Sequence, residues 1–323
     1  MNILYIFGNG FDKAQGMKTG YPEFYQYLMK NTDGGSPLLQ KMKEEINSDE
    51  ELWSDMEEAF GRFTSKIETA IDLENIYFEL CDHLQDYLIT EENNYNPTDK
   101  IKNKFVRDFI YPSRYLGETD RIRYISFFKN IGANNDISVM TLNYTNTLEK
   151  LLSLGIATDR RFENNNYFRQ VIHVHGQLED SIIIGVDNEE QIANEQFRKN
   201  EDVKDILVKV QSNNTMKFTR HNTCENLIAN AHLIILSGVS LGETDVRWWK
   251  LIGEQLKKRD NLVIIQHIYM PNTILPTRKQ LLGRIERKQR DLLLKKFEIT
   301  KKDCPEDLED RLFFITNSNA FKI

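Results

Sequence analysis

Four short groups of glycine, asparagine, histidine and serine residues could carry chemistry in this sequence. The first is Gly8-Asn9-Gly10-Phe11-Asp12, which follows the apolar run 3–7 and precedes Gly16. A strand that enters a Gly-x-Gly turn and then a helix lets backbone N–H groups approach a phosphate, and the helix N-terminus adds positive potential. The spacing is neither G-x-G-x-x-G nor a P-loop, and an Asn-Gly hairpin turn is the structural alternative. Asp12 would either cap the helix or contact ribose hydroxyls.

An asparagine is the first candidate catalytic residue. Asn143 lies in the segment 141–146, directly after the apolar run 137–140. Residues just beyond the carboxyl ends of parallel strands line the ligand crevice of an open sheet, and an amide there offers a donor and an acceptor without charge. The alternative is that this segment only caps the helix expected over 147–152.

A histidine is the second candidate catalytic residue. In His173-Val174-His175-Gly176, strand alternation places both imidazoles on one face, with His175 nearer the mouth of the crevice. A side chain with a pKa near 6.5 suits general-base work at cellular pH. His173 could instead be a core histidine with satisfied hydrogen bonds. A metal pair is a further alternative, but no third ligand stands at a telling spacing, so we expect no metal.

The fourth group, residues 237–245, follows the apolar run 233–236. Gly238 and Ser240 at a strand end suit close contact with a nucleotide ribose or phosphate. Thr244 or Asp245 could cap the next helix. A plain strand-to-helix loop is the alternative interpretation.

The elements that must position these groups alternate between strands and helices. Strand-like runs stand at 3–7, 137–140, 170–174, 182–184, 233–236, 262–266 and 312–315. Helical segments separate most of them, notably 188–211 and 245–258. This predicts an α/β fold with a Rossmann-like, mostly parallel sheet covered by helices on both faces. About a hundred helical residues follow the first strand, too many for an ordinary crossover. We therefore expect a nucleotide-binding core of residues 1–20 plus 132–323 and a helical insertion of residues 21–131.

Within that insertion, residues 53–57 contain both polar and apolar candidates. Glu57 could reach into the crevice as an acid or base, whereas Trp53 and Phe60, seven residues apart, are typical core anchors.

Composition excludes several classes of protein. The chain has 323 residues, 40% hydrophobic and 28% charged, with a mean hydropathy of −0.53. This is typical of a soluble globular protein, and no apolar run approaches the ~20 residues of a membrane span. The three cysteines, Cys81, Cys224 and Cys304, argue against a disulfide framework. The start has no basic leader, so we expect a cytoplasmic location.

One basic segment stands out in an acidic chain. The formal net charge is −7, yet residues 278–302 hold ten Lys or Arg and three Asp or Glu, a net of +7. On a helix, Arg284, Arg287, Lys288 and Arg290 could meet successive nucleic-acid phosphates. A solvated basic face that offsets the acidic remainder is the favoured alternative.

Together these motifs resemble those of the AbiH family of bacteriophage abortive-infection proteins. The resemblance spans most of the chain up to about Lys258, and its most specific part is the opening motif. It is carried by Gly8-Asn9-Gly10-Phe11-Asp12 with Gly16, Lys18, Thr19 and Tyr21, by residues 52–57, by residues 141–144, by residues 173–176 and by residues 240–245.

More remotely, the same order of motifs looks like a sirtuin-like NAD-binding layout. The matching positions are Gly8, Gly10, Gly16, Asn143, His175, Gly238 and Ser240. That resemblance implies that Asn143 positions the nicotinamide ribose or a water, and that His175 acts as a base. Three scattered cysteines cannot supply the four-cysteine zinc module of the deacetylases, and Thr145 replaces an acidic residue. Protein deacetylation is therefore disfavoured.

The resemblance implies an anti-phage defence protein that binds NAD, as substrate or ligand, and acts as an NAD glycohydrolase-like hydrolase. The candidate catalytic residues are then His175 and Asn143. The nucleotide-binding candidates are Gly8, Asn9, Gly10, Phe11, Asp12, Gly238 and Ser240. A nucleotide sensor without turnover and a nucleic-acid-directed protein are the alternatives. The sequence leaves open the true nucleotide, a phage-derived trigger and assembly into a homo-oligomer.

Overall fold

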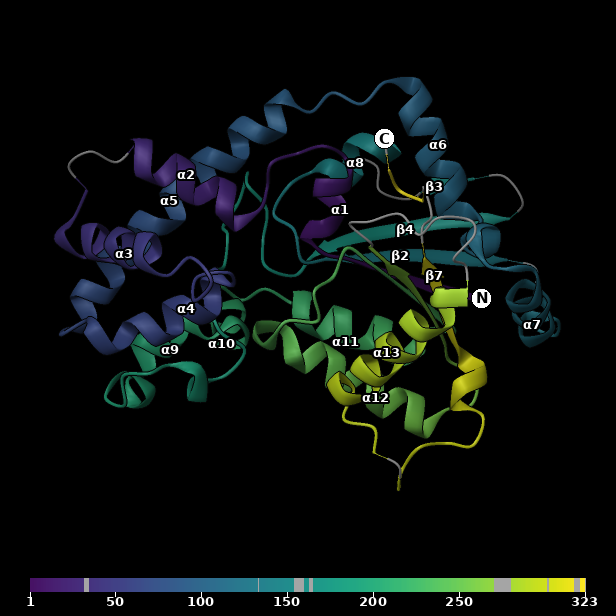
Figure 1. The fold of residues 1–323 in the computed structure, drawn as a ribbon. Coiled ribbons are helices and arrows are strands. Elements are labelled where there is room, and N and C mark those ends of the chain that lie inside the picture. Colours follow the sequence, from purple (N-terminus) through teal and green to yellow (C-terminus); the bar gives the residue numbers. More distant parts are fainter. Residues whose placement is uncertain are drawn as a thin grey trace.

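The computed structural model describes residues 1–31, 35–132, 134–153, 160–162, 165–269, 280–300, 302–316 and 320–322. In this part of the chain the central feature is a sheet flanked by helices (Figure 1). It has seven strands in the order β3-β4-β2-β1-β5-β6-β7. Its strands are β1 (Asn2–Phe7), β2 (Asn135–Thr141), β3 (Arg160–Arg161), β4 (Asn166–His173), β5 (Leu233–Ser237), β6 (Val263–Ile268) and β7 (Leu312–Thr316).

Six of these strands are parallel, and only the two-residue β3 runs antiparallel, against β4. Counted in chain order, the parallel strands stand as 3-2-1-4-5-6, which is the order of Rossmann folds. The prediction of a Rossmann-like α/β fold is therefore confirmed. The order reverses between β1 and β5, and ligands of such sheets bind beyond the carboxyl ends of the strands at that switch point.

Helices cover both faces of the sheet, as β1 shows by its alternation. Tyr5 and Phe7 join a core with α6 (Asp99–Ile110), α7 (Glu118–Phe128) and α8 (Thr147–Leu152). Leu4 and Ile6 join another core, on the opposite face. The helices that supply that second core are α11 (Arg220–Asn230), α12 (Val246–Lys258) and α13 (Gln280–Lys296).

A separate helical lobe stands beside the sheet (Figure 1). We call it the helical lobe and define it by its helices: α2 (Tyr21–Asn31), α3 (Pro37–Ser48), α4 (Met56–Phe63), α5 (Ala70–Asn94), α9 (Glu201–Leu207) and α10 (Lys209–Thr215). Its core contains Trp53 and Phe60, as expected of anchors, together with apolar residues between 178 and 208.

The lobe is thus composed differently from the expected insertion of residues 21–131. The later part of that range, α6 and α7, packs on the sheet rather than in the lobe. Residues 178–208, which come from after β4, complete the lobe instead. Two excursions of the chain, one after β1 and one after β4, therefore build it together.

Candidate functional site

The loops after β1 and β5 touch at the switch point of the sheet. The N–H of Gly8 donates to the carbonyl of Ser237 at 3.2 Å, and the N–H of Gly10 donates to that of Gly238 at 2.9 Å. Gly238 has a φ of +70°, in the left-handed region that favours glycine. The glycines of these loops therefore allow two backbones to approach each other.

The sequence predicts that backbone N–H groups of residues 8–12 hold a phosphate, but several of these groups already donate to protein carbonyls. The N–H of Phe11 also donates inside the protein, to the carbonyl of Gly8 at 2.8 Å. The Phe11 ring is buried with its centroid 4.5 Å from that of Phe7, so its side chain belongs to the core. Asn9 is half-buried and donates its side-chain amide to the carbonyl of Thr19 at 2.8 Å. A phosphate would have to displace some of these bonds.

Two predicted nucleotide contacts remain open to solvent. Gly10, in the first turn of the helix that follows β1, and Ser240, in the loop after β5, are exposed. Gly238, in the same loop as Ser240, is half-buried.

Asp12 does not cap α1 (Asn9–Ala14), whose N-cap is Gly8. Its carboxylate accepts a hydrogen bond from the Thr145 hydroxyl at 2.6 Å, and within the described part of the chain its second oxygen has no partner. Burial raises the pKa of Asp12 to about 6, although the hydroxyls of Thr145 and Thr147 and the amide of Asn143 act in the opposite direction. Asp12 therefore joins the β1 loop to the segment after β2.

The Asn143 side chain also links the segment after β2 to the residues after β1. Its Nδ2 donates to the carbonyl of Gly8 at 3.2 Å, and its backbone N–H donates to Oγ1 of Thr141 at 3.1 Å. The side chain faces the glycine loop, as the sequence predicts for a residue beyond a strand end. In this conformation it is 7% exposed.

The two histidines of the H-x-H motif have different surroundings. His173 ends β4, and both of its ring nitrogens have partners at 2.9 Å: the carbonyl of Asn143 and Oε1 of Glu149. The interpretation of His173 as a core histidine with satisfied hydrogen bonds is thus confirmed. His175 lies beyond the strand, in the turn, so strand alternation does not relate the two rings.

His175 has the arrangement of a general base. Its Nε2 lies 2.8 Å from Oδ1 of Asp245, whereas its Nδ1 is buried and has no hydrogen-bond partner among the described residues. A carboxylate accepts from N–H, so Asp245 keeps the proton on Nε2 and leaves a lone pair on Nδ1. Burial lowers the pKa of His175, the Lys209 cation lowers it further, and Asp245 acts in the opposite direction. The ring is therefore neutral near pH 7 and able to accept a proton.

A buried ion network surrounds this pair. The Lys209 ammonium lies 2.7 Å from Oε2 of Glu57 and 3.2 Å from Oδ1 of Asp245. Asp55 caps α4 and accepts from the N–H of Glu57, which fixes where that side chain leaves the helix. Burial raises the pKa of Glu57 to about 7, since the Lys209 cation lowers it by less. Glu57 thus reaches the site from the helical lobe.

Sequence reasoning missed two members of this network. Asp245 stood in the fourth motif but was interpreted as a cap, and its side chain makes no capping hydrogen bond at α12. Lys209 carried no signal, because it lies in a stretch expected to be one ordinary helix. Both residues belong to the site because they pair with side chains that are distant in the sequence.

The candidate catalytic residues lie at neighbouring strand ends. β2 and β4 are paired, and the N–H of Val174 extends that pairing to the carbonyl of Thr141 at 3.0 Å. His175 is 3% exposed, so it and Asn143 are both covered, while the Asp245 side chain is 14% exposed. A substrate can reach His175 only if neighbouring segments move.

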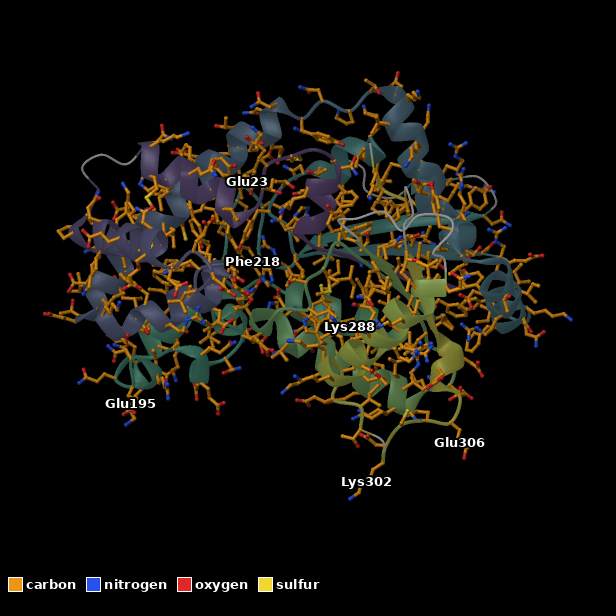
Figure 2. All side chains as sticks on the ribbon, viewed as in Figure 1. Glu23, Glu195, Phe218, Lys288, Lys302 and Glu306 are labelled. Atoms are coloured by element: carbon orange, nitrogen blue, oxygen red, sulfur yellow. The ribbon has the colours of Figure 1, made fainter. Side chains whose placement is uncertain are left out.

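The structure also locates the basic segment. Arg284, Arg287 and Lys288 are exposed on α13, and Figure 2 labels Lys288 there. Arg290 is paired with Glu309 at 3.0 Å. Arg278 and Lys279 lie outside the described residues.

Two kinds of feature are absent from the described residues. Across the described ranges, no three His, Cys, Asp or Glu side chains are placed to share a metal ion. In the same part of the chain, no helix combines the length and apolarity that crossing a membrane requires.

The strand order defines a Rossmann-like α/β protein, and a buried cluster of ionisable side chains lies beyond the carboxyl ends of its strands. The family model described as "Bacteriophage abortive infection AbiH" matches residues 4–267, so the chain belongs to the AbiH family of phage-defence proteins. Among curated proteins, none matches the chain significantly.

Proposed function

We propose that this AbiH protein is a cytoplasmic defence enzyme that hydrolyses the N-glycosidic bond of NAD or a related nucleotide. The observation that carries the proposal is the state of His175. Its Nε2 is held by Asp245, and its buried Nδ1 has no hydrogen-bond partner in the described part of the chain. A neutral imidazole with one free lone pair, beside the switch point of a Rossmann-like sheet, is suited to general-base catalysis on a bound nucleotide.

The reaction divides into simple transfers. The bond between C1′ of the ribose and the pyridinium nitrogen breaks, and its electron pair neutralises that nitrogen, so nicotinamide leaves uncharged. A water oxygen bonds to C1′, and the proton of that water passes to Nδ1 of His175. The products are nicotinamide and ADP-ribose. Because the ribose becomes cationic before the water adds, holding the ribose and the water in the right geometry contributes to the catalysis.

The other predicted residues fit the remaining tasks. Gly10, in the first turn of α1, and Ser240, in the loop after β5, are exposed, and there they would contact ribose or phosphate groups. Asn143 would orient the ribose or the water once its bond to the Gly8 carbonyl exchanges for one to the substrate. The conformation described here is then a resting state, in which His175 and Asn143 are covered. A closed resting site suits an activity that would harm the cell that makes it.

The test measures nicotinamide release from NAD by the purified protein, alongside the NAD content of infected cells that express it. We expect release by the wild type, and loss with His175→Ala and with Asn143→Ala. His83→Ala is the matched control, because His83 is a half-buried histidine of α5 outside the site.

Three outcomes separate the alternatives. Release that survives both site variants would show that the catalytic residues are wrongly assigned. Tight nucleotide binding by calorimetry, with no product in the tube or in infected cells, would favour the sensor without turnover. Salt-sensitive retention of DNA or RNA, abolished by reversing the charges of Arg284, Arg287 and Lys288, would favour the nucleic-acid alternative.

A further inference from the structure

Lys209 makes three contacts with protein oxygens, and they use all of its donors. Its ammonium lies 2.7 Å from Oε2 of Glu57, 3.0 Å from the carbonyl of Thr244 and 3.2 Å from Oδ1 of Asp245. An ammonium has three N–H groups, so none remains for a substrate. The side chain is 3% exposed. Lys209 is therefore built into the protein rather than presented to a ligand.

We infer that Lys209 is a positioning residue, which holds Asp245 ionised and in place so that His175 stays neutral with Nδ1 free. The inference rests on the proposed function of His175 as the base. It adds to that function a lysine and, through it, Glu57, both supplied by the helical lobe.

One carboxylate oxygen of Asp245 contacts both His175 and Lys209. Oδ1 lies 2.8 Å from Nε2 of His175 and 3.2 Å from Nζ of Lys209. Burial by itself would raise the pKa of Asp245, but the Lys209 cation and then His175 lower it, and it stays below its ordinary value. Because the carboxylate already has a cation, it does not require a protonated imidazole as well.

Removal of the Lys209 cation would change the charge balance around the Asp245 carboxylate. A buried carboxylate without a partner is costly, and the nearest group that could neutralise it is the His175 ring. Arg220 also lowers the pKa of His175, but by less than Lys209 does. The pKa of His221 is lowered to about 3, chiefly by burial and next by its interaction with His175. His221 therefore stays neutral. Lys209 is thus the main cation that keeps His175 unprotonated.

Glu57 fixes Lys209 in turn. Its Oε2 accepts from Lys209, and its Oε1 accepts from the N–H of Gly185 at 3.3 Å. Burial lowers the pKa of Lys209, but the carboxylates of Asp245 and Glu57 together raise it by a larger amount. The ammonium therefore stays charged. Asp187 lies in the segment that follows Gly185, and the charges of Asp245 and Lys209 also affect its pKa. The lobe therefore supplies both the cation and the anion that retains it.

The experiment reads the protonation of His175 directly, without any substrate. Long-range ¹H–¹⁵N spectra of histidine-labelled full-length protein are recorded from pH 5 to pH 8.5. The chain has six histidines, and His175→Gln identifies the signal of interest by its loss. We expect the wild-type ring to be neutral, with its proton on Nε2, throughout the upper part of this range.

Lys209→Met is the informative variant. We expect the titration midpoint of His175 to rise by roughly one unit or more, which is a tenfold change in proton affinity. Lys209→Arg keeps a cation and should keep the wild-type midpoint. Glu57→Gln keeps Lys209 and should also leave the imidazole neutral. Since Lys209→Met leaves Glu57 and Asp245 without a cation, the double variant Lys209→Met/Glu57→Gln provides a second test with the same expected rise.

An unchanged midpoint and tautomer in Lys209→Met or in the double variant would overturn the inference. Where NAD turnover is measurable, the acid limb of its pH profile should move to higher pH in Lys209→Met and not in Lys209→Arg. A shifted His175 titration in a protein that hydrolyses no nucleotide would uphold the positioning role and reject the proposed function. The two failures are therefore distinguishable.

Discussion

Gly10 and Gly238 approach so closely that each occupies the space a Cβ on the other would need. A Cβ on Gly10 would lie 2.8 Å from Cα of Gly238, and a Cβ on Gly238 would lie 2.2 Å from the backbone nitrogen of Phe11. The contact joins the loop after the first strand to the loop after β5. It holds the centre of the candidate site together, so we expect its loss to affect both stability and nucleotide binding.

Gly238→Ala should lower the free energy of unfolding by at least about 2 kcal/mol, because it combines a backbone clash with strain at positive φ. Gly132→Ala is the control, since a Cβ there would meet nothing within 4 Å, and it should change stability by less than about 0.5 kcal/mol. Denaturant unfolding of both variants checks the difference. Equal effects would mean that the two loops are not in contact in solution.

The Asp12 carboxyl should make stability depend on pH. Its pKa is raised to about 6 in the folded protein, chiefly by burial, so the folded state binds the proton more tightly than the unfolded state does. That contribution is complete below the ordinary aspartate value and is lost as the pH rises through about 6. Asp12→Asn removes the ionisation and should gain up to about 3 kcal/mol relative to the wild type between pH 4 and pH 8. Urea unfolding across this range measures it, and a difference that does not vary with pH would contradict it.

Trp53 should be an anchor of the helical lobe. It is fully buried in the lobe core, and its carbonyl accepts from the Tyr25 hydroxyl at 2.8 Å. Trp53→Ala should cost about 3–5 kcal/mol through the cavity it leaves. Leu52→Ala, next in the chain but 45% exposed, should cost less than about 0.5 kcal/mol. Thermal and denaturant unfolding compare the two, and similar losses would argue against the packing described here.

The His173 side chain should contribute to the stability of the fold. His173→Ala removes partners from the Asn143 carbonyl and from Glu149, so it should cost about 1–3 kcal/mol of stability. His83→Ala, on α5, is the matched histidine control and should cost less. Chemical denaturation gives both values. If the His173 variant were as stable as the control, its hydrogen bonds would contribute nothing.

Much of the fold follows from short apolar runs. The run 3–7, which Gly8 follows, becomes β1, and 233–236 becomes β5, because buried parallel strands need continuous apolar sequence. The run 182–184 has the same composition and is not a strand. It is buried in irregular chain, with one bridge between Ile182 and Gly176. Periodicity in so short a run reports burial and cannot report whether a partner strand is present.

The region between 188 and 211 shows a second limit. A single helix was expected there, but short 3₁₀ turns at Glu189–Gln191 and Phe197–Lys199 precede α9. Asn188 and Asn200 accept from backbone N–H groups and start new turns, which competes with a continuous helix. The break gives Lys209 its position at the start of α10.

The candidate site was predictable only in part for a related reason. Residues at strand ends, such as Asn143, follow from topology, because parallel strands end at one edge. The link from Glu57 through Lys209 to Asp245 joins three distant segments, and ion pairs between distant segments leave no local pattern in a sequence.

The central position of β1 has a consequence for biosynthesis. Its two neighbours, β2 and β5, are translated long after it, and β5 begins only at Leu233. At ~5–20 residues per second, the ribosome needs roughly 10–45 s to travel from the first strand to β5. Until β5 is made, the nascent chain lacks one of the two neighbours of β1, together with Gly238 and Asp245. A polypeptide that is still being made, or that stops early, therefore carries no assembled centre.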